Sequence, residues 1–197
     1  MKLSRTLVQL CAVLMFCGLS ALAQTVPGDA KQFAKDGLSF SYGAGWAFND
    51  TSNSDAQQMT FGRSDGDAQI TVFVFRANLT KPEQIAEAKR VLVDKYVTST
   101  TRQFQQEDPK TQSTPATSEI GGVASEGVKI RASLGGVPGT AEIQSAVVGQ
   151  RLVVLTLLGP DKDLKKAAPV WDLMRTTIKV ESPQPKTQPS PSPKSTP

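Results

Sequence analysis

Two segments of this chain are apolar on both sides of an extended strand, and this pattern restricts the folds it can adopt. They are "ITVFVF" at residues 70–75 and "LVVLTLL" at residues 152–158. Successive side chains of a strand point to opposite faces of a sheet, so a strand that is apolar on both faces must be covered on both. The two segments therefore predict the centre of a sheet that lies between two covering layers.

Other segments alternate between apolar and polar residues, which is typical of strands with one buried face. They are "LSFSY" (38–42), "MTFGR" (59–63), "VKIRASL" (128–134) and "AEIQSAVV" (141–148). Turn sequences such as "SDGD", "GGVPG" and Gly149-Gln150 join neighbouring strands as hairpins. We therefore predict an α+β fold, with a central, mainly antiparallel sheet and helices on both faces.

Two segments have the spacing of amphipathic helices. The first follows "TKPE" at residues 80–83, a capping-box pattern with proline in the first turn. Its apolar stripe is Ile85, Ala88, Leu92, Tyr96 and Thr100. The second helix is expected near residues 163–176, with Leu164, Ala167, Trp171 and Met174 on one face and Pro169 kinking it or starting a new first turn. Residues 106–115 are polar with two prolines and predict a mobile loop.

The amino-terminal residues 1–23 have the pattern of a signal peptide. Lys2 and Arg5 precede an apolar run, and "ALA" at residues 21–23 is a cleavage site before Gln24. Lipid attachment at Cys17 is the alternative, and the bulky Phe16 before it disfavours that reading. The pattern predicts an exported protein, periplasmic or extracellular, without a transmembrane span in the mature chain.

The rest of the chain divides into one domain, residues 24–180, and a tail, residues 181–197. The tail is made largely of Pro, Ser, Thr, Lys and Gln, which predicts a disordered segment. It is either a solvated terminus, a spacer or wall-contacting stalk, or a proline-motif ligand. The formal net charge of +4 falls to +2 when Lys2 and Arg5 are removed, and no basic stripe indicates a nucleic-acid partner.

The composition excludes several classes of active site. The chain has no histidine, and both cysteines, Cys11 and Cys17, lie in the predicted signal peptide. The mature chain thus has no Ser-His-Asp or Cys-His site, no thiolate or histidine metal ligands and no disulfide. Carboxylate or lysine chemistry is what remains, and a hydrolase with two converging acids is a third, weaker hypothesis.

The acidic and glycine pairs have structural interpretations. Asp65 and Asp67 lack the spacing of a calcium loop, so we interpret them as a hairpin turn. Asp161 and Asp163 are interpreted as the capping and dipole charges of the second helix. Neither Gly121-Gly122 nor Gly135-Gly136 is followed by the Lys-Ser/Thr of a phosphate loop. We therefore predict no catalytic residue, no metal ligand and no cofactor site.

The segment "GLSFSYGAGW" at residues 37–46 resembles the opening of the PsbP/Mog1-like (DcrB-like) domains. Gly43 stands where those domains commonly have proline. The resemblance continues through "AQITVFVF", "IGGVASEGVKI", "GQRLVVLTLLGP" and "VWDLMRTTIKV", and so covers most of residues 37–180. It implies an antiparallel sheet between helices, in small exported or partner-binding accessory domains that share no catalytic site.

Trp46, at the end of that segment, has two interpretations. It is a core anchor where a strand turns, or an aromatic contact in a cleft or interface. For the whole protein, the leading hypothesis is a non-enzymatic exported domain that binds a protein partner or an envelope component. The alternative is a small-ligand carrier with a pocket between sheet and helix.

Overall fold

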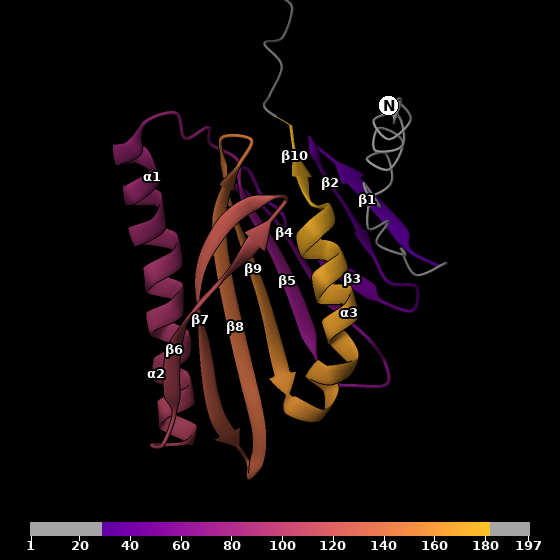
Figure 1. The fold of residues 1–197 in the computed structure, drawn as a ribbon, viewed down its shortest axis with the longest axis vertical. Coiled ribbons are helices and arrows are strands. Elements are labelled where there is room, and N and C mark those ends of the chain that lie inside the picture. Colours follow the sequence, from indigo (N-terminus) through magenta and orange to yellow (C-terminus); the bar gives the residue numbers. More distant parts are fainter. Residues whose placement is uncertain (1–28, 182–197) are drawn as a thin grey trace, which may run out of the picture.

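The computed structural model describes residues 29–181, which form a large sheet, a small sheet and helices on both faces of the large sheet (Figure 1). The large sheet is antiparallel throughout, with the order β3-β4-β5-β9-β8-β7-β6. Its strands are β3 (Ala47–Asp50), β4 (Ala56–Gly62), β5 (Gln69–Phe75), β6 (Gln112–Ile120), β7 (Val123–Leu134), β8 (Val137–Val148) and β9 (Arg151–Pro160). The two segments that are apolar on both faces, β5 and β9, pair at its centre, as predicted.

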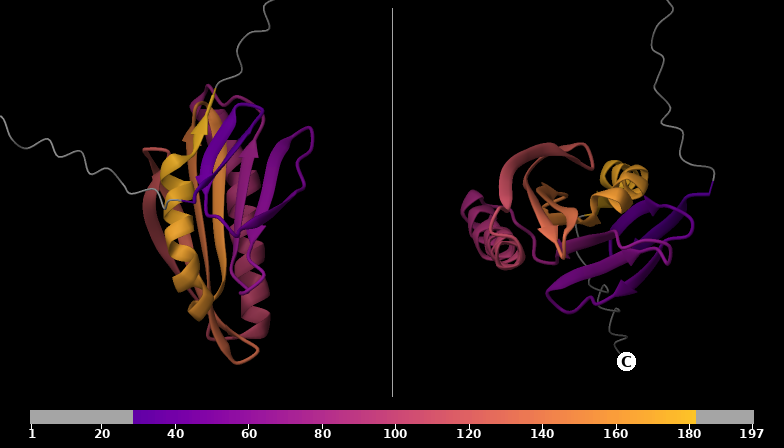
Figure 2. Two further views of the ribbon diagram at one scale, coloured as in Figure 1. Left: turned by 90° about the vertical axis from the view of Figure 1, so that its right-hand side faces the viewer. Right: turned by 90° about the horizontal axis from the view of Figure 1, so that it is seen from below.

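Two layers cover this sheet. One face holds α3 (Asp161–Thr177) and the small sheet of β1 (Lys31–Lys35), β2 (Leu38–Tyr42) and β10 (Lys179–Val180). The other face holds α1 (Pro82–Ala88), the π-helical turn η1 (Lys89–Asp94) and α2 (Lys95–Glu107). Figure 2 shows the two helical layers on opposite sides of the strands. The predicted α+β fold, a mainly antiparallel sheet between helices, is therefore confirmed.

The apolar residues form two cores, one on each face of the large sheet. Ile70, Val72 and Val74 of β5 belong to the core beneath α3 and the small sheet. Phe73 and Phe75 of the same strand pack in the core beneath α1, η1 and α2. The alternation in this strand thus divides its side chains between two separate hydrophobic layers.

The predicted stripe of the first helix is wrong at Tyr96. The stripe assumes 3.6 residues per turn, but η1 is wider and takes an extra residue. The buried face is therefore shifted by one residue beyond Leu92, and Val93 and Val97 face the core instead. Tyr96 remains 41% exposed on the flank of the helix.

Both helices differ from the sequence prediction in detail. In α1 the Gln84 side chain accepts hydrogen bonds from the backbone N–H groups of Thr80 and Lys81, at 3.1 Å each, so Gln84 completes the cap rather than Glu83. The α3 helix is continuous through Pro169, and no new first turn begins there. Proline has no N–H to donate to the carbonyl four residues earlier in the helix. Pro169 is exposed, so solvent can bind that carbonyl instead.

The predicted loop at residues 106–115 is wrong over most of its length. The helix α2 extends to Glu107, and β6 begins at Gln112. β6 is a polar edge strand that pairs along its whole length with β7. This backbone pairing holds the segment as a strand, although its side chains do not follow a strand pattern. Pro115 is exposed within it, as edge strands allow.

Several predictions concern residues outside the described range. The signal peptide at residues 1–23, with Cys11 and Cys17, and the tail from residue 182 onward lie there. Of the helices within residues 29–181, none has the length and apolar character needed to cross a membrane.

Candidate functional site

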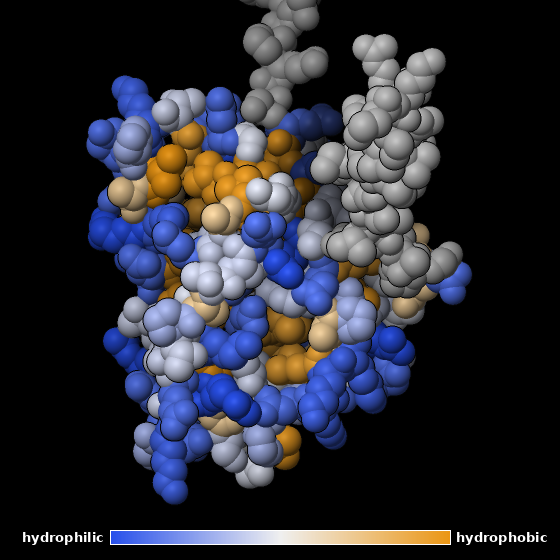
Figure 3. All heavy atoms as spheres, viewed as in Figure 1, coloured by the Kyte–Doolittle hydropathy of each residue, from blue (hydrophilic) through white to orange (hydrophobic). Residues whose placement is uncertain are grey.

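An open groove of about 490 Å³ runs along α3, between this helix and the facing side of β7, β8 and β9. We call it the α3 groove. It exists because α3 and the small sheet cover only part of this face, while β6 and β7 curl around its far side (Figures 1 and 2). In Figure 3 apolar surface is visible in the middle of this face, beside α3, between hydrophilic borders.

The floor of the α3 groove is apolar. It is formed by Leu157 of β9 and by Leu164, Ala168 and Trp171 of α3. Leu157 and Trp171 are buried, and Leu164 is half-buried. Trp171 therefore belongs to the core, as its place on the predicted stripe indicated, and it also lines the groove.

The rim of the α3 groove is made of paired charges. Lys129 of β7 lies 3.1 Å from Glu142 of β8, and Arg131 lies 3.0 Å from Asp161. At the other end of α3, Arg175 pairs with Asp172 at 3.0 Å. Lys165 also lines the groove and has no ion pair among the described residues. The groove thus presents both signs of charge around an apolar floor.

The carboxylates of the sheet side are held in place by further hydrogen bonds. The Thr140 hydroxyl donates to Asp161 Oδ1 at 2.8 Å, while Arg131 binds Oδ2. Gln144 Nε2 donates to Glu142 Oε1 at 3.3 Å, and the Ser125 hydroxyl donates to Gln144 Oε1 at 3.1 Å. Both oxygens of Glu142 and of Asp161 therefore have a hydrogen-bond or ion-pair partner.

Gly127 makes room for this arrangement. It lies opposite Gln144 in the β7–β8 register, and Gln144 is fully buried. A Cβ atom on Gly127 would lie 2.7 Å from Gln144 Oε1 and would overlap the carbonyl oxygen of Ile143. The absence of a side chain at Gly127 thus lets Gln144 reach Glu142 at the rim.

Gly127→Ala is expected to lower the free energy of unfolding by about 1–3 kcal/mol, the usual effect of overpacking. Thermal unfolding measures this change. Gly122→Ala is the contrast. An added Cβ there meets no atom within 4 Å, so its effect on stability comes from the strained φ of +77° and not from overpacking. A Gly127→Ala protein as stable as the wild type would contradict the close packing.

Trp46 is buried, with 3% of its surface exposed, so the core interpretation is confirmed. Its Nε1 is a buried side-chain nitrogen without a hydrogen-bond partner within residues 29–181. The turn before it is closed by a hydrogen bond from Trp46 N–H to the carbonyl of Gly43 at 3.3 Å. A Cβ on Gly43 would lie 2.7 Å from Val170 Cγ2, so α3 already fills the space that a proline would need.

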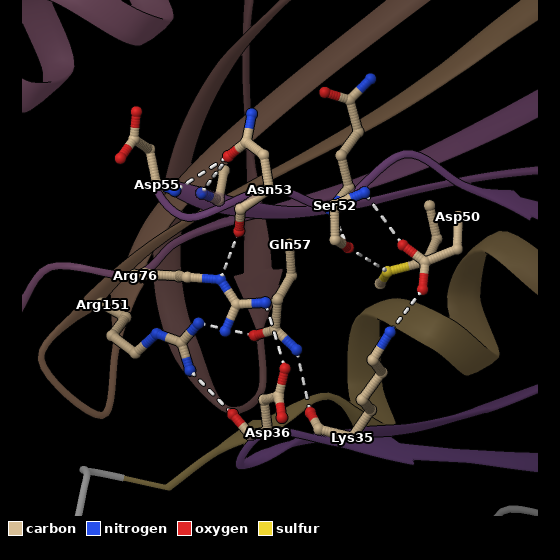
Figure 4. Close-up of polar contacts among 12 residues, drawn as sticks. Lys35, Asp36, Asp50, Ser52, Asn53, Asp55, Gln57, Arg76 and Arg151 are labelled. Atoms are coloured by element: carbon tan, nitrogen blue, oxygen red, sulfur yellow. Dashed lines mark hydrogen bonds and ion pairs between the residues drawn. The ribbon is translucent and has the colours of Figure 1, made fainter.

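A second polar cluster surrounds Arg151, which is 3% exposed. Its guanidinium donates to Gln57 Oε1 at 2.6 Å and to the Asp36 carbonyl at 3.3 Å (Figure 4). It also donates to the Phe75 carbonyl at 3.0 Å. Gln57 Nε2 then donates to the Lys35 carbonyl at 2.9 Å. Burial lowers the pKa of Arg151, as does the nearby Arg76 cation, but a guanidinium stays protonated in proteins.

This cluster connects the two sheets rather than forming a binding site. Asp36 and Lys35 belong to the β1–β2 hairpin, whereas Gln57 and Arg151 belong to the large sheet. At the surface, the hydrogen bond from Lys35 holds the pKa of Asp50 well below its usual range, with a smaller effect of Ser52. Arg76 adds a contact to Asp36 at 3.1 Å. We assign the cluster to the attachment of the hairpin.

The acidic residues singled out in the sequence lie in turns and at the start of α3. Asp65 pairs with Arg63 in the β4–β5 hairpin, as the turn interpretation expects. Asp161 and Asp163 lie in the first turn of α3, but neither side chain caps it. Asp161 binds strand residues instead, and the buried Asp163 accepts a 3.3 Å hydrogen bond from Asp67 N–H. Within the described residues no cluster of acidic side chains could hold a metal ion.

Sequence reasoning did not find the α3 groove. The alternation of "VKIRASL" places Lys129 and Arg131 on the polar face of a strand, which usually faces solvent. Asp161 was interpreted as a capping and dipole charge of the helix that it begins. The pairing of these side chains depends on the β7–β8 register and on where α3 begins, neither of which has a local signal.

No family model and no curated protein matches this chain, but several solved structures do. A cyanobacterial PsbP from Synechocystis has 15% identity and a TM-score of 0.48, over 83% of this chain and 96% of that protein. A Bacteroides thetaiotaomicron protein has 14% identity and a TM-score of 0.51, over 78% of this chain and 49% of that one. Mycobacterium tuberculosis LpqN, described as involved in cell envelope biogenesis, has 10% identity and a TM-score of 0.47, over 78% of this chain and 91% of that protein.

At these identities the likeness concerns the fold alone. One of these structures is a PsbP, and the sequence segments described above resemble PsbP/Mog1-like domains. The Bacteroides thetaiotaomicron protein, with a TM-score of 0.51, shares the overall fold described above.

Proposed function

We propose that this protein is a non-enzymatic, exported accessory domain that binds a segment of a partner protein of the cell envelope in the α3 groove. The proposal rests on one observation, an open groove with an apolar floor and a rim of both charge signs. Protein interfaces combine an apolar, desolvated centre with a polar rim in this way. The signal-peptide pattern at residues 1–23 supports export to the periplasm or the extracellular space.

The partner is expected to present both apolar and charged side chains. The apolar floor would take the apolar side chains, and Lys165, which has no ion pair within the described part of the chain, would attract a carboxylate. The rim carboxylates already bind cations, so the described residues of the groove offer no pair of free acids for hydrolysis. For these reasons we favour binding over catalysis.

The test is photo-crosslinking in the native envelope, with a photoreactive lysine analogue that keeps the ammonium group placed at Lys165 or at Lys162. Both are exposed lysines of α3, but only Lys165 lines the groove. We expect a discrete protein adduct from position 165 that is absent from position 162. Ala168→Glu, which places a charge on the exposed part of the floor, should abolish that adduct. Equal adducts at both positions, or none at 165, would refute the proposal.

A second candidate function, a small-ligand carrier, is favoured by a separate cavity between sheet and helix. This cavity lies on the opposite face of the large sheet, between η1 and α2 on one side and β4, β5 and β9 on the other. This cavity supports the predicted alternative and is separate from the α3 groove.

A further inference from the structure

The cavity on the helical face has a volume of about 240 Å³. Phe73 of β5 and Val154 of β9 form its apolar floor, and Leu92 and Tyr96 form the helical wall. Pockets for drug-sized ligands span about 300–1,000 Å³. This cavity therefore suits a smaller compound, of one or two rings.

The π-helical turn creates the helical wall of this cavity. Because η1 shifts the register of the helix, Leu92 is only half-buried and Tyr96 lies on the flank instead of in the core. An α-helix throughout would have placed Tyr96 on the predicted buried stripe. Such π-turns occur frequently at functional sites.

The sheet side of the cavity has hydroxyl and amide groups without partners. Thr156 pairs with Thr71 across β5 and β9 and is 5% exposed, yet its hydroxyl makes no hydrogen bond within residues 29–181. The Gln58 amide and the Tyr96 hydroxyl also line the cavity and lack a partner among the described residues. The Thr156 hydroxyl is accessible from the cavity rather than sealed in the core, so a ligand with a hydroxyl or carbonyl group can replace water as its hydrogen-bond partner.

We propose that this cavity binds a small, uncharged compound that has an apolar ring system and a hydroxyl or carbonyl group. Phe73 and Tyr96 would contact the ring faces, and Thr156, with Gln58, would bind the polar group. Among residues 29–181, no acidic or basic side chain lines the cavity, so a charged ligand would be desolvated there without a counter-ion. The inference rests on the second candidate function and is independent of the α3 groove.

The test uses the full exported chain and 2-naphthol, a neutral two-ring probe with one hydroxyl, in a calorimetric titration. We expect saturable binding to one site. Thr156→Val should weaken it about fivefold, the equivalent of one hydrogen bond. Because the Thr156 hydroxyl makes no hydrogen bond within residues 29–181, the melting temperature should not fall.

Tyr96→Ala should weaken binding about tenfold, since it removes an aromatic wall. Thr98→Ala, an exposed position on the same helix outside this cavity, is the matched control and should bind as the wild type does. The groove variant Ala168→Glu should also retain naphthol binding, so failure of one proposal is distinguishable from failure of the other.

Three results would overturn this inference. They are the absence of saturable naphthol binding to the wild type, unchanged binding by Thr156→Val and Tyr96→Ala, and a Thr156→Val protein that melts lower while binding normally. The last would show that the hydroxyl supports the fold instead of a ligand.

Discussion

Replacing Trp46 by alanine is expected to lower the free energy of unfolding by about 3–5 kcal/mol, the usual effect of removing a buried aromatic side chain. For a domain of this size, that corresponds to a fall in melting temperature of about 10 °C. The ring is 3% exposed and contacts the core beneath α3, so the loss leaves a cavity between strand and helix. Thermal and denaturant unfolding measure the change.

Two control variants separate this packing effect from others. Tyr96→Ala removes an aromatic ring that is 41% exposed, and should change stability much less. Trp46→Phe keeps most of the ring and removes the Nε1 that lacks a partner, so it should be milder than alanine. If Trp46→Ala has the same melting temperature as the wild type, the residue is not a core anchor.

Arg151→Met is expected to destabilise the protein by about 3 kcal/mol or more, because hydrogen bonds to charged groups are worth about 1.5–3 kcal/mol each. The Gln57 side-chain oxygen and the Phe75 and Asp36 carbonyls would lose their donor together. Methionine fills a similar volume, so the effect measured by unfolding is mainly that of the lost donors.

The comparison for Arg151 is Arg63→Met, which breaks an exposed ion pair with Asp65. Exposed pairs contribute about 0–1 kcal/mol, so this variant should melt close to the wild type. Arg151→Lys should resemble Arg151→Met, since an ammonium group cannot reproduce the planar fork that reaches three acceptors. Similar stabilities for Arg151→Met and Arg63→Met would show that the hairpin is held by apolar packing alone.

The fold was predictable where side chains follow a simple period. The segments apolar on both faces indicated β5 and β9 at the centre of the sheet, and alternation indicated β2, β4, β7 and β8. Short or polar strands gave no such signal, and β1, β3, β6 and β10 were missed. Backbone pairing holds these strands, as in the register of β6 with β7, and a single sequence does not encode pairing locally.

The candidate sites were less predictable than the fold. Tyr96 was assigned to the core because no residue in "KRVLVD" distinguishes a π-turn from an α-turn. Arg151 stands at the start of a strand, where arginine usually lies in solvent, and its burial depends on the distant hairpin turn at Asp36. Both positions are decided by tertiary contacts rather than by local periodicity.

The edges of the large sheet bear on how this protein behaves at high concentration. An unpaired strand edge can template the addition of a strand from another molecule, which leads to aggregation. At one edge, β6 is polar and Pro115 lacks the N–H that an added strand would need. At the other, β3 has four residues and ends at Asp50, whose carboxylate binds Lys35. Each edge is thus a poor template for an added strand, which lowers the tendency of the protein to aggregate at high concentration.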